Sequence, residues 1–104
     1  MQVINIIVSD CETGIISIDS FGVLDDIDKH KTVEQAEELY VEKCTTIKYG
    51  NKETREKIIA NGVFDYSDID DFTDEVNETI EDGYVEVNGI TVSFVWSHIE
   101  NVQL

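Results

Sequence analysis

The chain has 104 residues, 41% of them hydrophobic, and its 23 acidic and 7 basic residues give a net charge of −16. This apolar content excludes a disordered acidic tail, and the length suffices for one domain, residues 1–104, that needs no metal or disulfide to fold. A negative charge of this size disfavours binding to nucleic acids or anionic membranes and attracts basic protein surfaces.

The cysteines and the N-terminal segment indicate a cytoplasmic protein. Cys11 and Cys44 lack the dense spacing of disulfide-rich secreted domains, so we expect free thiols. The first residues contain neither the basic region nor the long apolar region of a signal peptide, and no segment approaches the roughly 20 apolar residues of a membrane span. We therefore expect a cytoplasmic location and no membrane contact.

Two strands joined by a turn are predicted at the N-terminus. Apolar residues alternate along the segment 3–8, and a second short strand is predicted at 15–19. The residues between them, 9–14, are turn-forming. A hairpin closed by this turn would bring Ile16 and Ile18 alongside the apolar face of the first strand.

A long helix is predicted in the middle of the chain. Residues 23–31 contain several aspartates, and we expect an irregular connection or a short helical turn there. Thr32 and Gln35 then form a capping box, so the helix should begin at Thr32 and run to Tyr49, before Gly50. Its predicted buried stripe consists of Val33, Ala36, Tyr40, Cys44 and Ile47.

Two shorter helices should follow. Asn51 is a suitable N-cap for a helix over 52–61, with Ile58 and Ile59 facing inward and Gly62 at its end. The other helix should begin after Ser67 and end before Gly83, with an apolar stripe made of Ile69, Phe72, Val76 and Ile80. This stripe leaves the opposite face of that helix almost entirely carboxylate.

The C-terminal part predicts a second hairpin. Asn88-Gly89 is the preferred dipeptide of a two-residue type I′ turn, which would place Val87 opposite Ile90. One face of the hairpin would then carry Val85, Val87, Ile90, Val92, Phe94 and Trp96. We expect Trp96 in the core and Tyr84, on the other face, as an exposed aromatic residue at an interface.

The order β-β-α-α-α-β-β predicts an α+β fold. The simplest arrangement is an antiparallel four-stranded sheet with the helices on one face. The order of the strands within the sheet is left open.

The acidic residues on and around the third helix are the candidate partner-binding site. One helical turn, about 5 to 6 Å, separates Asp71 from Glu75 and Asp74 from Glu78, close to the spacing of successive phosphates in a nucleic-acid strand. The alternative is a solvated face that confers only solubility. The candidate residues are Asp65, Asp68, Asp70, Asp71, Asp74, Glu75, Glu78, Glu81, Asp82 and Glu86.

Other chemistry has little support in the sequence. A calcium-binding loop that starts at Asp65 would place Asp70 where an EF-hand requires glycine. Cys11 with His30 or His98 could form a nucleophile and base, but no oxyanion-forming motif surrounds the cysteine. We therefore predict no catalytic residue, no metal site and no cofactor.

In size and composition the chain resembles the small acidic DNA-mimic inhibitors that phages and mobile elements encode against restriction or CRISPR nucleases. The resemblance implies a non-enzymatic protein whose acidic face blocks the basic groove of a nucleic-acid-handling protein. An immunity protein or antitoxin that neutralises a basic toxin would use the same electrostatics. A small enzyme or ligand-binding domain would instead need a concave pocket with convergent polar groups.

Overall fold

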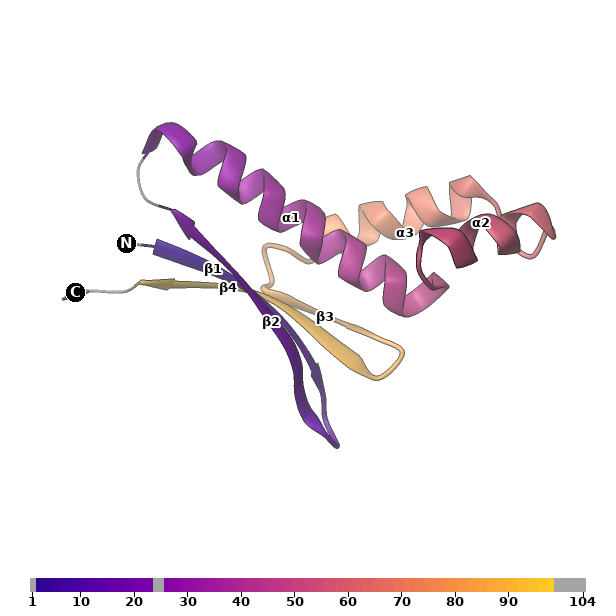
Figure 1. The fold of residues 1–104 in the computed structure, drawn as a ribbon, viewed down its shortest axis with the longest axis horizontal. Coiled ribbons are helices and arrows are strands. Elements are labelled where there is room, and N and C mark those ends of the chain that lie inside the picture. The colour runs from indigo at the N-terminus through magenta and orange to yellow at the C-terminus, as the bar shows by residue number, and fades with distance from the viewer. Residues whose placement is uncertain (1, 24–25, 99–104) are drawn as a thin grey trace.

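A computed structural model describes the backbone of residues 2–23 and 26–98 and all of their side chains except those of 26–28. These residues form one antiparallel sheet and three helices. The strands are β1 (Gln2–Asp10), β2 (Gly14–Val23), β3 (Tyr84–Val87) and β4 (Ile90–His98), and the helices are α1 (Asp26–Tyr49), α2 (Lys52–Ala60) and α3 (Tyr66–Glu78). The predicted α+β fold and element order are confirmed, and the strand order is β2-β1-β4-β3. Figure 1 shows the helices on one side of the sheet.

The core lies between the helices and one side of the sheet, which we call the covered face. On this face Ile6 of β1 lies opposite Phe94 of β4 and Val8 lies opposite Val92, and all four are buried, as is Ile4. The ring of Tyr40 meets that of Phe94 edge-on, with 5.9 Å between the ring centroids. The helices contribute Ala36, Tyr40 and Cys44 from α1 and Phe72 and Val76 from α3.

A β-bulge near the first turn changes the register between β1 and β2. Ser9 pairs with Ile15, but Val8 pairs with Ser17, so Ile16 is an extra residue between the two pairs. A bulge of this kind turns every later side chain of the strand to the other face.

The bulge corrects the prediction for Ile16 and Ile18. Ile18 lies opposite Ile7, on the side of the sheet away from the helices, and both Ile16 and Ile18 are exposed rather than packed in the core. Phe21 and Val23 take their place, because β2 runs on to Val23 and the shifted register turns these two residues to the covered face.

Helix α1 begins earlier than predicted. It starts at Asp26, so Thr32 is an interior residue and not an N-cap, and most of the irregular connection expected at 23–31 is helical. No glycine or proline interrupts the segment before Thr32, so helical hydrogen bonding can continue upstream of the capping box. Residues 24–25 of that connection lie outside the described residues.

The ends of α2 and α3 are set by side-chain caps. Asn51 caps α2 as predicted, accepting a hydrogen bond from the amide of Thr54 at 2.9 Å. Helix α3 starts after Asp65 instead of Ser67, and it ends at Glu78 instead of continuing to the residues before Gly83. At this end the Thr79 hydroxyl donates to the carbonyl of Val76 at 2.6 Å, and residues 79–83 form turns instead of continuing the helix.

The β3–β4 hairpin forms as predicted. Asn88 and Gly89 both have positive φ, 51° and 81°, as a type I′ turn requires, and Val87 lies opposite Ile90. The expectation that Trp96 is in the core is wrong, since the residue is 43% exposed. Its register places it opposite Ile4 at the end of the sheet, where Lys29, near the start of α1, lies 5.9 Å from its ring centroid.

The side of the sheet turned away from the helices is the open face. Among the described residues no helix or strand packs on it. Tyr84 is exposed there as predicted, whereas Val3 near the start of β1 is buried. The strand register assigns to this face Val3, Asn5, Ile7 and Ser9 of β1, Ile15, Ile18, Ser20 and Gly22 of β2, Tyr84 and Glu86 of β3, and Thr91, Ser93, Val95 and Ser97 of β4. Glu86 is the one charged residue among them.

Candidate functional site

Helices α1 and α3 pack side by side in antiparallel directions. The hydroxyl oxygens of Tyr40 and Thr79 are 2.6 Å apart, and the ring of Tyr49 meets that of Phe72 edge-on at 5.5 Å between centroids. Because the later residue of α1 meets the earlier residue of α3, the two helices run in opposite directions. Burial of Tyr40 raises the pKa of its hydroxyl, so this link between the helices is made by a neutral phenol.

The outer side of this helix pair is hollowed into an acidic groove. The groove has a volume of about 310 Å³. It is lined by Glu34, Glu37, Glu38, Val41 and Glu42 of α1 and by Thr73 and Asn77 of α3. Residues three or four positions apart lie on one side of a helix, so α1 directs a row of carboxylates to this groove.

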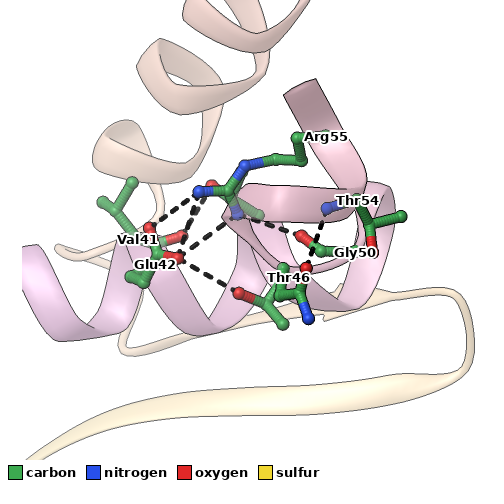
Figure 2. Close-up of polar contacts among 8 residues, drawn as sticks. Val41, Glu42, Thr46, Gly50, Thr54 and Arg55 are labelled. Atoms are coloured by element: carbon green, nitrogen blue, oxygen red, sulfur yellow. Dashed lines mark hydrogen bonds and ion pairs between the residues drawn. The ribbon is translucent and has the colours of Figure 1, made fainter. Parts of the chain in front are cut away.

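Arg55 of α2 pairs with Glu42, one of the groove residues, and Figure 2 shows this contact. Its Nη1 and Nη2 each donate to Glu42 Oε1 at 3.2 Å, and Nη1 also donates to the carbonyl of Gly50 at 3.0 Å. The Thr46 hydroxyl donates to the same carboxylate at 3.3 Å. Glu42 is therefore part of the joint between α1 and α2, whereas Glu34, Glu37 and Glu38 form no ion pair with any described residue.

Two of the predicted site residues have a structural role at the start of α3. The Asp65 carboxylate accepts from the amide of Asp68 at 3.1 Å, and the Asp68 carboxylate accepts from the amide of Asp65 at 2.9 Å. A hydrogen bond from the Ser67 hydroxyl, with that from the Asp68 amide, holds the pKa of Asp65 below its usual range. This reciprocal capping box explains both carboxylates without a partner protein.

The other predicted residues on α3 are Asp70, Asp71, Asp74, Glu75 and Glu78, and all five are exposed. Asp74 lies between Thr73 and Asn77, the two residues through which α3 lines the acidic groove. Glu81 and Asp82 are exposed in the turn that follows the helix. Within 2–23 and 26–98, none of the ten predicted carboxylates takes part in an ion pair.

Glu86 lies in a different setting from the carboxylates along the acidic groove. It belongs to the edge strand β3 and, with Glu75, lines a second hollow of about 310 Å³ between α3 and β3. Lys48 lines the same hollow, with its Nζ 4.3 Å from the ring centroid of Phe72. The negative surface is therefore interrupted on this side of α3.

The glutamates of α1 were not predicted as site residues because lysines are interspersed with them along the chain. Residues 29–57 are nearly neutral in total, yet their charges separate by helix face. Lys43 turns to β2, where its Nζ lies 3.3 Å from the Asp19 carboxylate. The spacing of Glu34, Glu37 and Glu38 on one side of α1 was the available signal.

The cysteines lie in contrasting places. Cys11 is exposed in the turn between β1 and β2, and Cys44 is buried in the core, so they form no disulfide with each other. Burial raises the pKa of the Cys44 thiol to about 12, which keeps it protonated and unreactive at neutral pH.

Metal-ligand geometry, helix hydropathy and similarity to known proteins assign no further function to the described residues. Over residues 2–23 and 26–98, no group of three or more His, Cys, Asp or Glu side chains is arranged to hold a metal ion. None of the helices described above is long and apolar enough to cross a membrane. Comparison with protein-family models, with curated proteins and with solved structures finds no match.

Proposed function

We propose that the protein is a non-enzymatic cytoplasmic binding protein whose acidic groove docks on the basic surface of another protein, in particular on the groove of a nucleic-acid-binding protein. The observation that carries this proposal is the row of glutamates that α1 directs into one concave surface, beside which Asp74 of α3 lies. No cation of the described residues pairs with Glu34, Glu37 or Glu38. A partner's lysines and arginines would supply the missing positive charge.

The fold does not require these carboxylates. Helix α3 packs through Phe72 and Val76, and like charges one turn apart, such as Asp74 and Glu78, cost about 0.2 to 0.5 kcal/mol per pair. Uncompensated repulsion of this kind is relieved when a basic surface approaches. This favours a binding role for the carboxylates over a role in stabilising the helices.

The spacing of the charges supports mimicry of a nucleic acid. Along each helix the carboxylates recur every turn, about 5 to 6 Å apart. A row of negative charges with this spacing offers a basic cleft a pattern similar to one strand of its nucleic-acid substrate, and attraction at long range would speed association.

Affinity capture from a nuclease-treated lysate of the source organism, followed by elution with short duplex DNA, tests this function. The wild-type protein should retain basic proteins that duplex DNA releases. The variant Glu34→Gln, Glu38→Gln, Asp74→Asn should fail to retain them. The control Glu12→Gln, Glu53→Gln, Glu56→Gln removes the same number of charges outside the groove and should behave as wild type.

The outcomes separate the competing functions. Equal capture by both triple variants would mean that the acidic groove confers only solubility. A basic protein that is captured through the groove but is not released by DNA would identify an antitoxin or immunity protein instead of a nucleic-acid mimic.

A further inference from the structure

We propose that the open face of the sheet is an interface at which two copies of this chain pack face to face. This inference rests on the sheet alone and does not depend on the acidic groove. Charged residues make up 29% of the chain, yet the open face carries only Glu86. Depletion of charge is the feature that separates the centre of a protein interface from ordinary surface.

The polar side chains at the centre of the open face bond to one another across the strands. Asn5 of β1 accepts a hydrogen bond from the Ser20 hydroxyl of β2 at 2.6 Å and donates one to the Ser97 hydroxyl of β4 at 3.1 Å. Ser97 in turn donates to the carbonyl of Val3 at 3.4 Å. Because these groups are already paired, covering them with another protein removes few hydrogen bonds to water.

Apolar side chains of the open face lie around these hydrogen-bonded polar residues. Ile7 and Ile18 lie opposite each other on neighbouring strands, and Ile18 is 53% exposed. Val95 on β4 and Tyr84 on β3 are also exposed. Tyrosine is enriched at interfaces because its ring supplies large contact area with few rotatable bonds.

Charge identifies a second copy as the occupant. A neutral face attracts neither a basic nor an acidic partner, whereas it is complementary to itself. In a face-to-face pair the two helix layers, which carry most of the acidic residues, would lie on opposite outer sides and leave both acidic grooves accessible. At about 3.3 Å per residue and about 4.8 Å between strands, the sheet covers about 500 Å². Two copies would bury at most about 1,000 Å², which is below the roughly 1,200 Å² of stable interfaces and typical of a weak, reversible dimer.

Pairing through a sheet edge is less favourable than pairing through the open face. The edge strand β2 contains the bulge residue Ile16, and its Asp19 is directed to the covered side, where Lys43 binds it. The other edge strand, β3, has only four residues. Bulges, inward charges and short length are the features that protect edges from pairing.

Sedimentation equilibrium of the whole chain, over a concentration series reaching about 0.5 mM, tests the proposal. The wild-type protein should approach twice 11.8 kDa. Since each copy carries a charge of −16, the dimer should be tighter at about 0.5 M salt than at about 10 mM, where the Debye length is about 30 Å. Binding of a basic partner at the acidic groove would weaken over the same range of salt.

Two variants and a control locate the interface. Ile18→Lys on β2 and Val95→Lys on β4 should each raise the dissociation constant of the dimer at least about tenfold. Val63→Lys introduces the same charge at a residue that is 76% exposed in a loop between α2 and α3, and it should leave the dimer intact. Thermal unfolding should show all three variants folded, because the replaced side chains are exposed.

Three results would overturn the proposal. The first is a mass of 11.8 kDa at every concentration and salt. The second is a dimer that Ile18→Lys dissociates and Val95→Lys does not, which would place the contact at the edge of β2. The third is an equal effect of Val63→Lys, which would show that added charge anywhere disrupts association.

Discussion

The two faces of the sheet differ in how they are covered and in how their polar groups are satisfied. The covered face carries Ile4, Ile6 and Phe94 under the helices, and its burial supplies the main apolar contribution to folding. The open face joins exposed apolar residues to serines and an asparagine that bond among themselves. Because the acidic residues lie mostly on the helices, the protein has one charged layer and one neutral surface, and the two suit different partners.

Truncation of an apolar side chain on each face should produce the largest difference. Ile6 is fully buried, so Ile6→Ala should lower the free energy of unfolding by about 2 to 5 kcal/mol. Ile18→Ala removes a side chain from the open face and should cost less than about 1 kcal/mol in a dilute, monomeric sample. Urea denaturation measures both, and equal losses would contradict the distinction between the faces.

The β3–β4 turn decides which residues of these strands reach each face, and altering it should have the next largest effect. Gly89 has a φ of 81°, and a Cβ there would meet no atom within 4 Å, so the cost of Gly89→Val is backbone strain, about 1 to 3 kcal/mol. Gly89→Asn should cost less, since asparagine tolerates this conformation. Identical denaturation midpoints for the two variants would show that strain at this residue is unimportant.

The hydrogen bond between Tyr40 and Thr79, which links α1 to the end of α3, should contribute less to the free energy of unfolding. Tyr40→Phe removes one hydrogen bond to Thr79 and keeps the ring against Phe94, so the expected loss is about 1 kcal/mol. Thr79 still donates to the carbonyl of Val76 and is not left unsatisfied. A loss as large as that of Ile6→Ala would mean that the helix pair depends on this hydrogen bond more than on apolar packing.

The acidic layer should show the smallest effect on stability, with the opposite sign. Replacing Asp71, Asp74, Glu75 and Glu78 by their amides removes repulsion one turn apart and should raise stability by about 0.2 to 0.5 kcal/mol per pair at low salt. Glu53→Gln is the matched control, because Glu53 pairs with Lys57 at 3.5 Å and its loss should lower stability slightly. Destabilisation by the α3 amides would assign these carboxylates a structural role.

The sequence predicted the elements whose signals are local, but not those decided by packing. Asn88-Gly89 fixed the second hairpin, since both residues favour positive φ. The bulge at Ile16 was not predictable, because Ile16 and Ile18 in one register and Phe21 and Val23 in the other are equally apolar. The second register is favoured only because β2 extends to Val23 and packs under α1.

The candidate site was predictable in part for a similar reason. The carboxylates of α3 stand in a segment without basic residues and are visible directly in the sequence. Glu34, Glu37 and Glu38 were obscured by lysines that the fold directs elsewhere, such as Lys43 to Asp19. The groove itself depends on the antiparallel packing of α1 against α3, which is a tertiary feature.

The most direct test of the proposed function is the association rate constant of the captured partner, measured at about 50 mM and about 0.5 M salt. The variant Glu34→Gln, Glu38→Gln, Asp74→Asn should associate at least about tenfold more slowly than wild type at low salt, with the difference shrinking at high salt. The control Glu12→Gln, Glu53→Gln, Glu56→Gln should match wild type. The same association rate for all three proteins at both salt concentrations would contradict docking through the acidic groove.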